Sequence, residues 1–96
     1  MLYRLYCSSG NKVGVDEYVC FSEIDTDGYW LRYVEIKANG IVLKYSREHI
    51  SDSYGMLPEG VWNEVEASKV EYGTVTGISK QLFNSVWSAS RGTNEA

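Results

Sequence analysis

Residues 18–45 read YVCFSEIDTDGYWLRYVEIKANGIVLKY, with Asp27-Gly28 and Asn39-Gly40 between three runs in which apolar and polar residues alternate. Asp-Gly and Asn-Gly readily adopt φ > 0 at both central positions of a two-residue hairpin turn. Alternation with a period of two is typical of β-strands. The stretch therefore predicts a three-stranded antiparallel meander whose turns lie at these two dipeptides.

The two turns also predict which residues lie opposite each other and which share a face of the sheet. The first turn predicts the pairs Val19/Ile36, Phe21/Val34 and Glu23/Arg32. The second turn predicts the pairs Ile36/Leu43, Val34/Tyr45 and Glu35/Lys44. One face, which we expect to be the core face, then carries Val19, Phe21, Val34, Ile36, Leu43 and Tyr45. The opposite face, which we expect to be at least half wet, carries Cys20, Ser22, Leu31, Tyr33, Val42 and the Glu35/Lys44 pair.

The rest of the chain predicts one more strand and one helix. Residues 2–7 alternate well enough for a strand. Ser79 is a good helix N-cap, and residues 79–90 carry an apolar stripe formed by Leu82, Phe83, Val86 and Trp87. Residues 47–60 should form a loop, residues 61–68 fit a helix or a strand, and the tail at 91–96 should fray. The economical architecture is α+β, an antiparallel four- or five-stranded β-meander sheet with a C-terminal α-helix packed on one face.

Length and charge limit the class of protein. The 96 residues make a single domain, 1–96, with one modest core. The net charge of −4 argues against nucleic-acid and anionic-membrane partners, because both require concentrated Lys and Arg. The charge is unevenly placed, since residues 48–71 carry six acids against Lys69 alone, whereas acids and bases cancel in residues 1–47. We therefore expect a basic protein partner.

Sites for metals, cofactors and catalysis are poorly supported. Residues 23–28 place carboxylates where a calcium loop has its first ligands, but the twelfth position is Val34 instead of Glu. His49 is the only histidine, and the glycine motifs of phosphate cradles and nucleophile elbows are missing from the sequence. We expect no metal, no cofactor and no enzyme activity; a small carboxylate-dependent enzyme that uses His49 is the weaker alternative.

The cysteines and the start of the chain bear on its location. Cys7 and Cys20 lie on predicted strands without CxxC spacing, so we expect reduced thiols. The first ten residues are too polar for the apolar region of a signal peptide, and no run approaches the roughly 18 apolar residues of a spanning helix. We expect a cytoplasmic protein without membrane contact.

Eight Tyr and three Trp are many for this length. Tyr and Trp are favoured where a surface makes contacts at low entropy cost. Tyr18 and Tyr33 belong to the outward face and Trp30 and Trp62 lie near turns, so an aromatic contact patch is one interpretation. Ordinary half-exposed aromatic residues of a small sheet are the other.

The stretch SEIDTDGYWLRYVEIKANG, residues 22–40, followed by GIS-x3-F-x3-W, residues 77–87, resembles a small bacterial family catalogued as domain of unknown function 6881. The resemblance spans most of the chain. It departs from the family pattern at Tyr33, where a Lys is usual, and in a less proline-rich middle segment. The shared residues are turns and core positions, so the resemblance implies a fold and brings no activity or functional residue with it.

The lopsided charge favours a binding protein of the immunity or inhibitor type. Such a protein would mask a basic, nuclease-type toxin by offering carboxylates where the enzyme expects phosphates. The residues that we expect to contact this partner are Glu59, Trp62, Glu64, Glu66, Glu71 and Tyr72. The alternative is an interaction or self-assembly module that forms a homodimer through Tyr18, Leu31 and Tyr33 on the outer sheet face.

Overall fold

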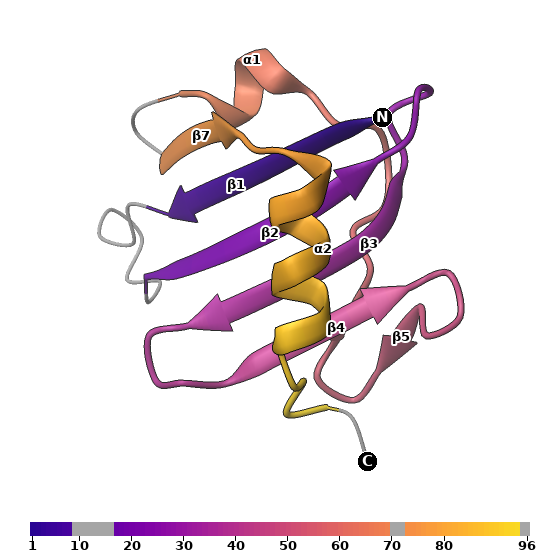
Figure 1. Ribbon diagram of the computed structural model, residues 1–96, viewed down its shortest axis with the longest axis vertical. Helices are drawn as coiled ribbons and strands as arrows, with labels where there is room; N and C mark the ends of the chain where they lie inside the picture. Colours follow the sequence, from indigo (N-terminus) through magenta and orange to yellow (C-terminus); the bar gives the residue numbers. More distant parts are fainter. Residues whose placement is uncertain (9–16, 70–72, 95–96) are drawn as a thin grey trace.

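The structure, a computed structural model, describes residues 1–8, 17–69 and 73–94. Its centre is a five-stranded antiparallel sheet in the order β4-β3-β2-β1-β7, crossed on one face by the C-terminal helix α2 (Figure 1). The strands of this sheet are β1 (Leu2–Ser8), β2 (Tyr18–Ile24), β3 (Trp30–Lys37), β4 (Val42–Ser46) and β7 (Gly73–Gly77). The other elements are β5 (Ser51–Asp52), β6 (Gly55–Met56), α1 (Glu64–Ala67) and α2 (Lys80–Ala89). The predicted α+β class with an antiparallel sheet and a C-terminal helix is confirmed.

Both hairpin turns of the meander have three residues in the loop. In the first, Asp25 N–H donates to Tyr29 O at 2.9 Å and the loop is formed by residues 26–28. In the second, Lys37 N–H donates to Ile41 O at 2.9 Å and the loop is formed by residues 38–40. Gly28 and Gly40 have φ of 94° and 90°, the left-handed conformation that closes a three-residue loop. The predicted two-residue turns are therefore each one residue too short.

The longer loops change the register of one hairpin only. A register shift between Glu23 and Ile24 absorbs the extra residue of the first loop, so the pairs Val19/Ile36, Phe21/Val34 and Glu23/Arg32 are confirmed. No such shift occurs between β3 and β4, so the predicted second register is wrong by one residue. The observed pairs there are Ile36/Val42, Glu35/Leu43, Val34/Lys44 and Tyr33/Tyr45.

A slip of one residue moves every side chain of β4 to the other face. Leu43 and Tyr45, predicted on the core face with Phe21 and Val34, lie instead on the face of Tyr33. Lys44, predicted on the wet face, lies beneath α2, where its ammonium group donates to main-chain oxygens of that helix. We name the side covered by α2 the helix face and the opposite side the second face.

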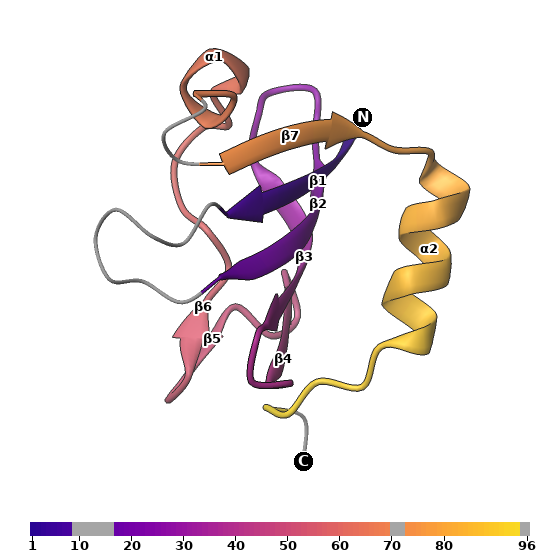
Figure 2. The same ribbon diagram turned by 90° about the vertical axis from the view of Figure 1, so that its left-hand side faces the viewer.

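The second face is a core and not a wet surface, which corrects the prediction. Residues 47–69, with β5, β6 and α1, lie on this face, while α2 lies on the other (Figure 2). Leu57, which is 6% exposed, packs from that segment onto the sheet. The buried cluster of the second face consists of Cys20, Tyr33, Leu43, Tyr45 and Leu57. The chain therefore covers both faces of one sheet, with a helix on one and an irregular segment on the other.

Helix α2 begins where the sequence predicts. Ser79 is the N-cap, and its side chain accepts a hydrogen bond from Leu82 N–H at 3.0 Å. Phe83 is fully buried against the sheet, while Leu82 is 47% exposed and so falls outside the packed stripe that was predicted to include it. Within the described ranges, no helix is long and apolar enough to cross a membrane.

The chain beyond α2 returns to the edge strand β4. Thr93 N–H donates to Val42 O at 2.5 Å, and the Thr93 side-chain hydroxyl accepts from Val42 N–H at 3.0 Å. Asn94 likewise accepts from Lys44 N–H and donates to Lys44 O, both at 3.1 Å. Thr93 and Asn94, which were predicted to belong to a frayed tail, are thus hydrogen-bonded to β4, and residues 95–96 lie outside the described residues.

Candidate functional site

Four of the six predicted contact residues lie in the segment that covers the second face. Glu59 is exposed in the connection between β6 and α1, and Trp62 is half-buried just before α1. Glu64 and Glu66 lie on α1 itself. The remaining two, Glu71 and Tyr72, lie outside the described residues, so the prediction for them is not tested.

Two of the predicted acids already have partners within the chain. Arg4 Nε donates to Glu64 Oε1 at 2.9 Å, and Trp62 Nε1 donates to Glu64 Oε2 at 2.5 Å. The hydrogen bond from Trp62, followed in importance by that from Arg4, lowers the pKa of the Glu64 carboxyl against the opposing effect of burial. Glu66 pairs with Lys69 at 3.1 Å. Among the residues that the structure describes, Glu59 has no such ion pair.

The first hairpin turn anchors the segment that carries these acids. Trp62 N–H donates to Gly28 O at 2.8 Å, and the Trp62 ring packs edge-on against Trp30 with centroids 5.8 Å apart. Asn63 caps α1 by accepting from Glu66 N–H at 2.9 Å. A Cβ placed on Gly28 would lie 2.6 Å from Val61 Cγ1, so glycine is required both for the φ of this turn and for the close approach of Val61.

A pocket of about 380 Å³ opens between the second face and this segment. Its walls include the five aromatic side chains Tyr6, Tyr18, Trp30, Tyr33 and Trp62, and we name it the aromatic pocket. Cys20 and Ser22 of β2 belong to its lining, and Glu66 of α1 contributes a carboxylate. The sequence predicted an aromatic patch from four of these rings, and the structure brings all four together. It missed Tyr6, which pairing with Cys20 in the neighbouring strand places on the same face.

The polar groups around the aromatic pocket are largely engaged by protein partners. Trp30 Nε1 donates to Ser22 Oγ at 3.1 Å, and Tyr33 OH donates to Glu35 Oε1 at 2.6 Å. Burial raises the pKa of Tyr33 and raises that of Cys20 to about 12, so both groups stay protonated at neutral pH. The pocket is therefore lined by aromatic rings and a protonated thiol, and Glu66 is the ionised side chain among its described lining residues.

A second surface feature lies beside the pocket. Large apolar side chains are strongly exposed along residues 50–65, although apolar groups of this size are usually covered. They are Ile50, Tyr54, Met56, Val61 and Val65, exposed by 45 to 78%. A hollow of about 260 Å³ is lined by Ile50 and Glu59 from this segment, by Tyr29 from the neighbouring turn and by Arg47. We name the surface around this hollow, formed by Tyr29, Ile50, Glu59 and the adjoining Val61, the contact face.

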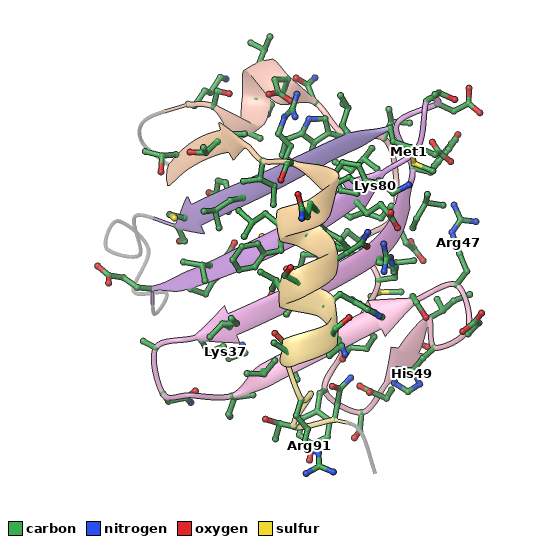
Figure 3. The ribbon with its side chains drawn as sticks, in the orientation of Figure 1. Met1, Lys37, Arg47, His49, Lys80 and Arg91 are labelled. Atoms are coloured by element: carbon green, nitrogen blue, oxygen red, sulfur yellow. The ribbon has the colours of Figure 1, made fainter. Side chains whose placement is uncertain are left out.

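His49 takes part in a polar cluster beside β5 (Figure 3). Its Nε2 lies 2.8 Å from Asp52 Oδ2, while Tyr45 OH donates to Asp52 Oδ1 at 2.7 Å and Asn94 Nδ2 donates to Asp52 Oδ2 at 2.9 Å. Desolvation raises the pKa of Asp52, but the hydrogen bonds from His49, Asn94, Tyr45 and the backbone of Tyr54 together lower it well below its usual range. The cluster ties the C-terminal tail to β5.

Neither a metal centre nor a thiol nucleophile is assembled in the described part of the chain. No group of three or more His, Cys, Asp or Glu side chains there could hold a metal ion. Cys7 and Cys20 are free thiols on opposite faces of the sheet, because Cys7 lies opposite Val19 and Cys20 opposite Tyr6. The contacts described for His49 join it to Asp52 and to the ring of Tyr45.

The predicted dimer surface is largely internal. Tyr33 is 9% exposed and Tyr18 and Leu31 are half-buried. Of these three residues, Tyr33 is buried within the chain itself, and the homodimer stays a prediction.

Comparisons of the chain with family models, with curated proteins and with solved structures found no match. The resemblance to domain of unknown function 6881 therefore stays a prediction.

Proposed function

We propose that the chain is a small acidic binding protein of the immunity or inhibitor type, which neutralises a basic, nuclease-type toxin through its contact face. The observation that carries this proposal is the set of exposed apolar side chains at the hollow of this face, Tyr29, Ile50 and the adjoining Val61, beside the exposed carboxylates of Glu59 and Asp27. Large exposed apolar groups rimmed by charge are typical of protein-binding surfaces.

The apolar side chains and the carboxylates would have different roles in recognition. Apolar groups such as Val61 and Tyr29 would supply the buried centre of the interface, where most binding energy is concentrated. The carboxylates would attract a basic surface and speed the encounter. Glu64 and Glu66 already form ion pairs within the chain, with Arg4 and Lys69 respectively. Both carboxylates are therefore weaker candidates for contact with the partner. Glu59, without an ion pair among the described residues, is the stronger candidate.

The test is protection of cells against a toxin domain encoded beside the gene of this protein. We expect Glu59→Lys combined with Val61→Lys to abolish protection and to weaken binding of the purified toxin domain at least about tenfold, the loss of one good interface contact. The matched control is Glu17→Lys, a reversal of an equally exposed acid at the start of β2. Circular dichroism must show that each variant is folded.

Full protection by the folded double variant would contradict the use of the contact face. Loss of protection by Glu17→Lys alone would show that net charge, and not this surface, carries the effect.

A further inference from the structure

We propose that the aromatic pocket is a binding site for a small organic cation, a compound with a quaternary or otherwise alkylated ammonium group. The proposal goes beyond the function proposed above, because masking a toxin through the contact face does not require a ligand in this pocket. It rests on the arrangement of rings, on the charge of the lining and on the engagement of its polar atoms.

Four of the rings come from three neighbouring strands of the sheet and the fifth, Trp62, from the covering segment, so rings line the pocket from both sides. Tyr6 and Tyr18 lie together with centroids 6.0 Å apart and planes tilted by 50°. Trp30 and Trp62 form the T-shaped pair, and Tyr33 lies on the strand between β2 and β4. The face of an aromatic ring carries negative charge density, and several faces around one volume attract a cation.

The charge of the lining has the sign that a cation requires. Among the described residues that line the pocket, Glu66 is the one ionised side chain, and none is Lys, Arg or His. The Glu66 carboxylate is shared with Lys69, but both side chains are about half exposed, at 58% and 46%. An exposed pair of this kind contributes about 0–1 kcal/mol, so it can exchange Lys69 for a bound cation at little cost.

The hydrogen-bonding state of the pocket favours an alkylated ammonium over a primary one. A primary ammonium brings three N–H donors, each of which needs an acceptor on burial. Within the described residues, the Ser22 hydroxyl accepts from Trp30 and the Glu66 carboxylate is paired with Lys69, so a primary ammonium would share both acceptors with partners already present. Methyl groups on the nitrogen need no acceptor and pack on ring faces.

The size of the pocket fits a small ligand. Ligand pockets commonly span about 300–1,000 Å³, and about 380 Å³ lies at the lower end of this range. The same trimethylammonium chemistry could be presented by a free compound such as choline or by a methylated lysine side chain. The experiment therefore includes both.

The test compares choline with 3,3-dimethylbutan-1-ol, a neutral compound of nearly the same shape, by titration of the purified full chain. We expect saturable shifts in tryptophan fluorescence and in the amide resonances of β2 and β3 with choline, and at least about tenfold weaker binding of the neutral compound. Binding of neither compound, or equal binding of both, would overturn the proposal. The amide of trimethyl-lysine, titrated in the same way, distinguishes a free small molecule from a side chain by which of the two cations binds tighter.

Variants separate the pocket from the rest of the surface. Trp62→Leu should abolish choline binding, and Trp62→Phe should keep part of it because a ring face remains. Glu66→Gln, at an exposed site where folding is not at risk, should weaken binding about threefold, as expected for one partly screened charge. Tyr54→Leu is the control, since Tyr54 is 58% exposed and lies outside the pocket lining. Unchanged affinity in both Glu66→Gln and Trp62→Leu would contradict the assignment. Toxin protection is a separate readout, so failure here leaves the contact face to be judged by its own test.

Discussion

Glu23 is a buried carboxylate at the centre of a network beneath α2. Arg32 donates to both of its oxygens, from Nε at 2.7 Å and from Nη2 at 2.9 Å, and Tyr3 OH donates to Oε2 at 3.0 Å. Arg32 Nη2 also donates to Asn84 Oδ1 at 2.7 Å, and the guanidinium lies over the ring of Phe83 at 4.9 Å. One ion pair thus joins the sheet to the helix.

Replacing this carboxylate should produce a stability difference that depends on pH. Hydrogen bonding from Arg32 is the largest influence on the pKa of Glu23 and lowers it, against the effect of burial. A lowered folded-state pKa stabilises the fold above the unfolded value and loses this effect as pH falls through the folded value. We therefore expect Glu23→Gln to destabilise the protein by about 1–3 kcal/mol at pH 7, and the difference from the unsubstituted chain to shrink as the pH falls below the ordinary glutamate pKa and through the lowered pKa of Glu23.

Urea unfolding at several pH values measures this difference. Glu17→Gln is the matched control, because Glu17 is exposed and should show no change. A difference of less than about 0.5 kcal/mol at pH 7, the size of an ordinary surface substitution, would contradict a stabilising role for the pair.

Gly28 and Gly40, in the two hairpin turns of the meander, have similar backbone conformations and different surroundings. Gly28 and Gly40 share nearly the same positive φ, but a Cβ at Gly40 meets nothing within 4 Å, whereas one at Gly28 meets Val61. We expect Gly40→Ala to cost about 1 kcal/mol for the backbone conformation alone. Gly28→Ala should cost more, because Val61 and the start of the covering segment must move. Thermal unfolding of both variants measures the difference.

Adding Val61→Ala separates the two effects in Gly28→Ala. If the contact is responsible, the second substitution recovers the excess cost over Gly40→Ala, as a coupling energy between neighbouring sites. Equal costs at the two glycines, with no coupling to Val61, would show that the turn does not hold the segment.

The same turns show how far sequence reasoning reaches. Asp-Gly and Asn-Gly located both bends, but each is compatible with a two-residue or a three-residue loop, and both place glycine at positive φ. Asp25 selects the longer loop in the first hairpin, since its carboxylate accepts from Asp27 N–H and Tyr29 N–H, both at 2.9 Å. In the first hairpin the register shift after Glu23 restores the predicted pairs, although the predicted loop is one residue too short. The second hairpin has no such register shift, so the prediction placed Leu43 and Tyr45 on the wrong face of the sheet.

The candidate site was predicted in part for the same reason. Trp62 and Glu66 were identified from local composition, and both line the aromatic pocket. The pocket itself depends on how residues 47–69 pack on the sheet, which are long-range contacts. No local sequence pattern in residues 47–60 indicates that Leu57 is buried. A face carrying Cys20, Ser22 and Tyr33 looks half polar until that segment is placed on it.

For the whole molecule, one sheet separates two environments with different roles. The helix face is covered by α2. Its charged groups Glu23, Arg32 and Lys44 form hydrogen bonds with each other or with α2. The second face is closed by an irregular segment that leaves the aromatic pocket beneath it and the contact face outside it. Both proposed functions therefore require that residues 47–69 pack on the side of the sheet opposite α2.

The most direct measurement of this arrangement is a nuclear Overhauser spectrum of the folded chain at neutral pH. Because Tyr45 and Leu57 share the buried cluster of the second face, the methyl protons of Leu57 should show cross-peaks to the ring protons of Tyr33 and Tyr45. Cross-peaks from the Tyr45 ring to the Phe83 ring of α2, with none to Leu57, would place Tyr45 beneath the helix and contradict the account.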